Sequence, residues 1–84
     1  MKKDILPIKI NVSSYSGYRV NERPEFIALD NRRLRVRNIL VMWVEPEKDY
    51  YKVLADEGNV YIISWNRYRD QWFLEKMPDL YSDV

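Results

Sequence analysis

Apolar and polar residues alternate along most of this 84-residue chain, as in Ile8, Ile10 and Val12, which Lys9 and Asn11 separate. A period of two places apolar side chains on one face of an extended strand and polar side chains on the other. The alternation therefore predicts a protein built from β-strands. The six predicted strands are Ile8–Val12, Glu25–Leu29, a run that begins at Arg33, Asp49–Ala55, Val60–Trp65 and Gln71–Met77.

The third predicted strand changes phase in its middle. Leu34 and Val36 occupy even-numbered positions, whereas Ile39, Val41 and Trp43 occupy odd-numbered positions. One extra residue at Arg37-Asn38, a β-bulge, would restore a common face and bend the strand sharply. The alternative is that residues 38–43 leave the sheet as a single helical turn. The pattern favours the bent strand.

Turn residues separate the predicted strands at short intervals. Tight turns are expected at Asp30-Asn31-Arg32 and at Asp56-Glu57-Gly58-Asn59, because Asp, Asn and Gly tolerate positive φ, and residues 66–70 are expected to form another connection. Pro78 is expected to end the last strand, and one longer loop covers Ser13–Pro24. Connections this short predict an all-β fold, a small antiparallel barrel or strongly bent sheet of five to six strands, SH3-like or OB-like.

Length and composition limit the chain to one small domain, residues 1–84, with an ordered core of about 8–77. The chain has no Cys and no His, so it lacks thiolate nucleophiles, imidazole bases and the commonest metal ligands. We therefore expect a protein that is not an enzyme and that binds no cofactor and no metal. No signal peptide or membrane-spanning run is visible, which predicts a cytoplasmic location.

Arginine and aromatic residues make up the candidate binding surface. Arg33, Arg35 and Arg37 alternate along one strand, and such a row of guanidinium groups can follow a phosphate backbone. Arginine next to aromatic residues can hold single-stranded nucleic acid by phosphate pairing and base stacking. The simpler interpretation is a solvated strand face with surface ion pairs and cross-strand aromatic pairs. The other candidate residues are Tyr61, Trp65, Arg67, Tyr68 and Arg69.

Short motifs are spread over most of the chain. They are Ser16-Gly17-Tyr18, Arg23-Pro24-x-Phe26, Leu34-x-Val36-x-x-Ile39-Leu40-x-x-Trp43, Asp49-Tyr50-Tyr51-Lys52-Val53, Gly58-Asn59-Val60-Tyr61-Ile62 and Trp72-x-Leu74-Glu75. This set resembles a family of small bacterial cytoplasmic proteins described as a domain of unknown function. The resemblance implies a stand-alone cytosolic domain without a known activity, with relatives encoded near DNA-repair polymerases. Val41 and Met42 are apolar where that family is expected to be polar, which indicates a local interface or a drier core.

These features predict a small non-catalytic binding module, either a monomer or a weak homodimer, with no membrane partner. We expect nucleic acid as the partner, bound by the arginine-rich strand and exposed aromatic residues. The alternative is a protein-interaction or homodimerisation module that uses an aromatic and apolar patch. The apolar run Ile39–Val44 supplies such a patch if its outer face is not covered. The phase change leaves open whether Trp43 lies in the core or on the surface.

Overall fold

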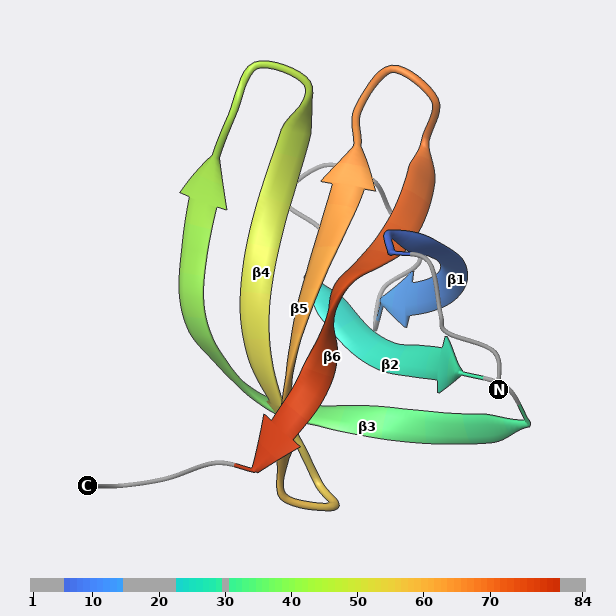
Figure 1. The fold of residues 1–84 in the computed structure, drawn as a ribbon, viewed down its shortest axis with the longest axis vertical. Coiled ribbons are helices and arrows are strands. Elements are labelled where there is room, and N and C mark those ends of the chain that lie inside the picture. Colours follow the sequence, from blue (N-terminus) through green and yellow to red (C-terminus); the bar gives the residue numbers. More distant parts are fainter. Residues whose placement is uncertain (1–5, 15–22, 30, 81–84) are drawn as a thin grey trace.

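The computed structural model describes residues 6–14, 23–29 and 31–80, and all of its regular elements are β-strands (Figure 1). Every predicted strand is present, and most extend one or two residues beyond the predicted bounds. The observed strands are β1 (Ile8–Ser14), β2 (Pro24–Leu29), β3 (Arg32–Val44), β4 (Lys48–Ala55), β5 (Asn59–Asn66) and β6 (Gln71–Leu80).

The strands form a closed antiparallel barrel in which each strand pairs with its neighbours in sequence. The barrel closes where Ile8–Ile10 of β1 pair with Trp72–Leu74 of β6. This confirms the prediction of a small all-β barrel. The up-and-down order differs from the Greek-key order of an OB-fold, so the OB-like alternative was wrong about connectivity.

The bent third strand is confirmed, because β3 is one continuous strand of 13 residues and contains no helical turn. Its pairing with β4 shifts register between Val36 and Asn38, which is the predicted bulge, and again between Ile39 and Val41. These bulges divide β3 into two halves of different direction. In Figure 1 the first half lies beside β2 at the lower end of the molecule, and the second half rises along β4.

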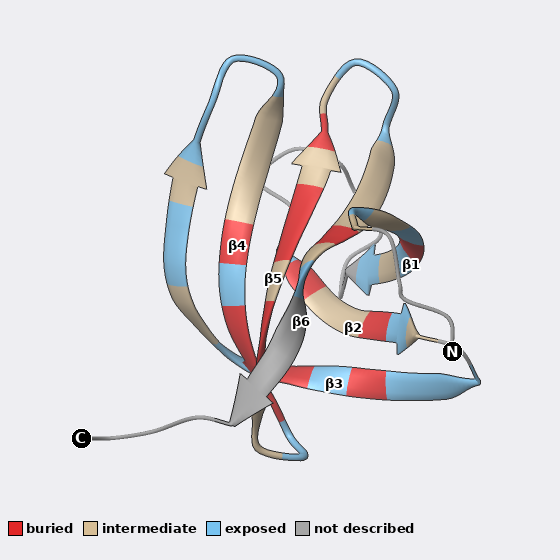
Figure 2. Cartoon of the chain, viewed as in Figure 1, coloured by how far each residue is buried: buried red, intermediate tan, exposed pale blue. Residues whose placement is uncertain are grey.

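Apolar residues on the inner faces of all six strands form the core (Figure 2). Ile27, Val53 and Ile63 are completely buried, and only in β4, where Lys52 precedes Val53, does alternation with a polar residue indicate the inner face. Burial of one such side chain contributes about 1.5–3 kcal/mol, so these positions account for much of the barrel's stability. The buried cluster consists of Ile10, Ile27, Leu34, Val36, Tyr51, Val53, Ala55, Tyr61, Ile63 and Leu74.

The turn after β4 follows the residues that predicted it, and the predicted connection after β5 is also a turn. Gly58 has a φ of 102°, and its N–H donates to the carbonyl of Ala55 at 2.9 Å. Asp70 has a φ of 56°, and its N–H donates to the carbonyl of Asn66 at 2.8 Å. Aspartate tolerates this left-handed conformation better than most residues other than glycine.

Two of the predicted boundaries differ from the observed ones. The strand β6 passes through Pro78 and ends at Leu80, so the prediction that Pro78 ends it was wrong. The β5–β6 ladder is irregular at this place, between Val60 and Ile62, and proline without an N–H is tolerated at such interruptions. Of the predicted loop Ser13–Pro24, the two serines at 13 and 14 belong to β1 and Pro24 to β2. Residues 15–22, and Asp30 of the predicted turn after β2, lie outside the described residues.

Candidate binding surfaces

The predicted row of arginines lies on the outer face of the first half of β3. Arg33 pairs with Ala28 and Arg35 with Phe26, and Leu34 between them points into the core. The Arg33 guanidinium lies 4.0 Å from the centroid of the Phe26 ring, and Arg35 lies 4.0 Å from a carboxylate oxygen of Glu25. Both guanidinium groups are therefore engaged by neighbours on β2, although exposed pairs of this kind contribute only about 0–1 kcal/mol.

Arg37 is set apart from that row, because it is the unpaired residue of the first bulge. Its side chain is exposed, and no residue of the described chain forms a hydrogen bond or ion pair with it. With Arg23 and Asn38 it lines a shallow depression of about 250 Å³. The regular row that could follow a phosphate backbone therefore holds only Arg33 and Arg35.

Tyr61 is not part of any surface, and its assignment as a binding residue was wrong. Its side chain is completely buried on the inner face of β5, and its hydroxyl donates to a Glu57 carboxylate oxygen at 2.6 Å. The same carboxylate accepts the Asn59 amide at 2.7 Å and lies 3.7 Å from Arg32. Burial, followed by the hydrogen bond to Glu57, raises the pKa of Tyr61 above its usual value.

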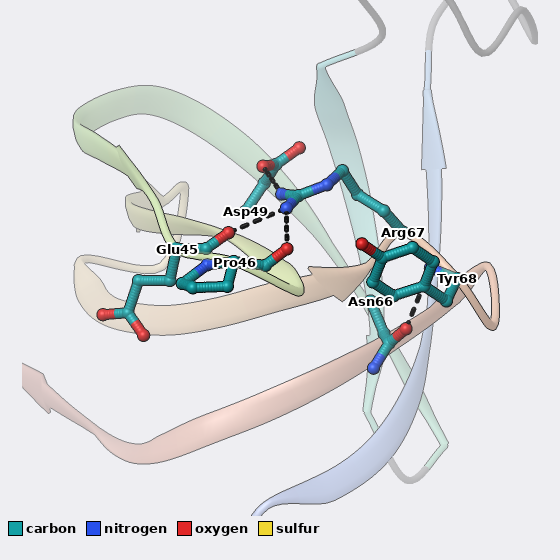
Figure 3. Close-up of polar contacts among 6 residues, drawn as sticks. All are labelled: Glu45, Pro46, Asp49, Asn66, Arg67 and Tyr68. Atoms are coloured by element: carbon teal, nitrogen blue, oxygen red, sulfur yellow. Dashed lines mark hydrogen bonds and ion pairs between the residues drawn. The ribbon is translucent and has the colours of Figure 1, made fainter.

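Arg67 is likewise occupied within the protein (Figure 3). Its guanidinium forms an ion pair with Asp49 and donates to the carbonyls of Glu45, at 2.8 Å, and Pro46. Its backbone N–H donates to the carbonyl of Glu47 at 3.1 Å. Arg67 thus joins the β5–β6 turn to the β3–β4 turn. This structural role accounts for the arginine without any need for a bound ligand.

The remaining candidates lie at the β5–β6 turn. The Trp65 indole N–H donates to Asp70 at 3.0 Å, and its ring lies 6.3 Å from that of Trp72, so this half-buried side chain is held in place. Tyr68 is 77% exposed and Arg69 is also exposed. The Asn66 side-chain oxygen, which accepts the backbone N–H groups of both residues, fixes this turn.

The predicted surface therefore separates into two parts. In Figure 1 the first half of β3, with Arg33 and Arg35, lies at the lower end of the molecule. The turn that carries Tyr68 and Arg69 lies at the upper end, along the longest axis. The barrel does not bring these parts together, so they cannot act as one continuous site for a short ligand.

A different surface appears on the second half of β3, which we call the β3 edge segment, Val41–Val44. Val41, Met42 and Val44 are 47%, 51% and 65% exposed, which is unusual for large apolar side chains in a small domain. Met42 pairs with the core residue Tyr51 and so lies on the inner face of the sheet. Val41 and Trp43 lie on the outer face, where Trp43 is half-buried.

The edge of this segment has no neighbour among the described strands. Strand β3 pairs with β2 only at Arg32–Arg35, and from Val36 onward it pairs only with β4. The N–H of Glu45 donates to the carbonyl of Lys48 at 2.8 Å, which makes this a hydrogen-bonded pair. Because such pairs alternate along an antiparallel ladder, the N–H and C=O groups of Met42 and Val44 point away from β4, towards the free edge.

On the outer face beside this segment, a polar group links three strands. Ser64 is completely buried and donates to a Glu75 carboxylate oxygen at 2.6 Å, and Lys48 lies 3.1 Å from the same oxygen. Burial, followed by the negative charge of Glu75, raises the pKa of nearby Tyr50, while Lys48 opposes this shift. These three side chains satisfy one another's hydrogen-bonding groups, and they hold β4, β5 and β6 together.

Residues 6–14, 23–29 and 31–80 hold no cluster of three or more His, Cys, Asp or Glu side chains suited to a metal ion. In the same residues no helix has the length and apolar character needed to cross a membrane. Comparisons with protein-family models, with curated proteins and with solved structures find no match. The family resemblance described above therefore stays an expectation.

Proposed function

We propose that this protein is a non-catalytic protein-interaction module that binds its partner at the β3 edge segment. The observation that supports this proposal best is the free edge at Met42 and Val44, where outward backbone groups coincide with exposed apolar side chains. A partner strand added there would receive main-chain hydrogen bonds and cover apolar surface in the same contact.

The composition of the segment strengthens the proposal. Exposed sheet edges in native proteins are usually blocked by lysine, by proline, by inward-pointing charges or by bulges. The run Val41-Met42-Trp43-Val44 has no charge and no proline, and it follows the last bulge of β3. Covering apolar surface contributes roughly 25 cal/mol per Å², so a partner that buries these side chains would be favoured.

Nucleic-acid binding through the arginine-rich strand is the weaker proposal. Arg33 and Arg35 are engaged by Phe26 and Glu25, and Arg67 is bound within the protein. The exposed turn residues lie at the other end of the barrel. With a net charge of +1, the protein also lacks an overall field that would attract phosphate.

Site-specific photo-crosslinking in the native cells tests the proposal. A benzophenone side chain in place of Met42 should yield discrete adducts, and the substitution Val44→Lys in the same chain should remove them, because lysine blocks edge pairing. The matched control carries the benzophenone in place of Arg69, an exposed position on another turn. The absence of adducts from position 42, or the same adducts from position 69, would overturn the proposal.

A further inference from the structure

We infer that the partner at the β3 edge segment is a second copy of the same chain, paired antiparallel so that Met42 of each copy lies opposite Val44 of the other. This inference rests on the proposed function and names its partner. Such a contact is a two-fold interface in which the same surface is used by both copies. It would join the two barrels through one continuous sheet.

The backbone selects this register. Only residues whose N–H and C=O groups point to the free edge can form hydrogen-bonded pairs there, and in the regular part of the segment these are Met42 and Val44. Pairing Met42 with Val44 of the second copy, and Val44 with its Met42, satisfies all of these groups. The two-fold axis then passes beside Trp43, at a pair without hydrogen bonds, where side chains approach most closely.

The side chains of the outer face also match in this register. The Trp43 ring stacks on Tyr50 of β4, with ring centroids 5.1 Å apart and planes 3° from parallel. Residues opposite each other in a sheet share a face, so Trp43 of the second copy would lie beside Trp43 of the first. The pair would extend into a row of aromatic rings across four strands, and aromatic cross-strand pairs stabilise sheets.

Charges at the margin of the contact are complementary as well. The register places Glu45 of the second copy opposite Val41, whose own partner on β4 is Lys52. Within the described chain, neither the Glu45 carboxylate nor the Lys52 ammonium has a hydrogen-bond or ion-pair partner. These long side chains can meet across the shorter Val41, once on each side of the axis. On the inner face, each Met42 would cover Val44 of the other copy, which removes their exposure.

Disulfide trapping tests the pairing directly, because the chain has no cysteine of its own. Residues of a hydrogen-bonded antiparallel pair lie about 5.5 Å apart at Cα, within the range that a disulfide spans. A mixture of Met42→Cys and Val44→Cys chains should therefore form mixed disulfides about tenfold faster than either variant alone, because association brings the two thiols together. Trp43 remains intact in this design.

A mixture of Val41→Cys and Val44→Cys chains is the matched control, because these positions lie on opposite faces of β3 and should not cross-link. The wild-type chain should double its mass with rising concentration in sedimentation equilibrium, and Val44→Lys should remain monomeric. A wild-type chain that stays monomeric at high concentration, or equal cross-linking in all mixtures, would overturn the inference.

The photo-crosslinking experiment separates this inference from the proposed function. An adduct from position 42 with twice the mass of the chain supports both. A discrete adduct of any other mass overturns the second copy as partner and leaves the proposed function standing. The absence of any adduct overturns both.

Discussion

Trp43 and Tyr50 lie on the outer face of the sheet as a parallel stack, 5.1 Å between ring centroids, directly beside the free edge of β3. The stack holds the second half of β3 against β4 at the place where no described strand supports it from the other side. An exposed edge stays ordered only if its single neighbour holds it firmly. The relationship between these two rings is therefore central to the surface that we propose for binding.

Replacing Trp43 by alanine should weaken both the strand and the contact. Loss of an aromatic pair costs about 0.5–1.5 kcal/mol beyond the buried area, so we expect a clear decrease in the free energy of unfolding. Urea unfolding at low protein concentration, followed by the fluorescence of the remaining tryptophans, measures it. The control Tyr68→Ala removes a 77% exposed ring and should change stability by less than about 0.5 kcal/mol. Equal effects of the two substitutions would contradict a structural role of the stack.

The contacts of Arg67 predict a purely structural role. Arg67→Ala leaves the Asp49 carboxylate and the carbonyls of Glu45 and Pro46 without this donor. Each hydrogen bond to a charged group contributes about 1.5–3 kcal/mol to stability, before the structure relaxes around the lost side chain. We expect a loss of about 2 kcal/mol in the free energy of unfolding. The neighbouring Arg69→Ala, which removes an exposed arginine, should leave stability within about 0.5 kcal/mol of wild type. If both variants unfold at the same urea concentration, the assigned role of Arg67 is wrong.

Substitution of Gly58 is expected to lower the stability of the protein because of its backbone conformation alone. A Cβ at this position would meet no atom within 4 Å, yet the φ of 102° is one that other residues rarely adopt. Gly58→Ala should therefore destabilise the protein by about 1–2 kcal/mol. Thermal unfolding measures this, with Asp56→Ala in the same turn as the control. An unchanged melting temperature for Gly58→Ala would show that the hairpin adjusts its conformation at no cost.

The raised pKa of Tyr61 predicts that the free energy of unfolding decreases at alkaline pH. Burial and the bond to Glu57 raise its pKa above 10 in the folded state, so folding favours the neutral phenol. Its contribution is therefore fully present below pH 10 and is lost as pH rises through the folded-state pKa. In urea unfolding at a series of pH values from neutral to above 10, Tyr61→Phe should lose less stability at the alkaline end than wild type does. Parallel curves for the two proteins would refute this assignment.

The arginine strand provides a test between protein and nucleic acid as partner. We expect a two-dimensional NMR titration with short single-stranded DNA and RNA to leave the spectrum nearly unchanged, even at low salt where phosphate contacts are strongest. The triple variant with Arg33, Arg35 and Arg37 changed to glutamate serves as the control for any residual shifts. Shifts on β3 that disappear in this variant and at moderate salt would instead support nucleic-acid binding.

Much of the fold follows from local patterns. Alternation identified the six strands, and the phase change at Arg37-Asn38 located the bulge that bends β3. Both signals are readable because they depend only on residues adjacent in the chain. The strand that continues through Pro78 was missed, because an irregular ladder that tolerates proline depends on the partner strand.

The candidate site was harder to read from the chain. Tyr61 and Trp65 share a face, as their spacing requires, but only the closed barrel shows that this face is the core at Tyr61. Arg67 looked available because its partner Asp49 lies 18 residues away, across the sheet. The apolar run Ile39–Val44 was a visible signal, although nothing in its composition shows that one edge is left without a neighbour.

By itself, the sequence determined the strands, most of the turns, the bend in β3 and the absence of cysteine and histidine chemistry, because periodicity and composition are local properties. Only the tertiary structure decided which aromatic and arginine side chains are occupied within the protein and which edge of the sheet stays open. Those outcomes depend on the register and extent of pairing between distant strands. In particular, β2 pairs with β3 only over Arg32–Arg35, so the edge of Val41–Val44 that faces away from β4 has no neighbour among the described strands.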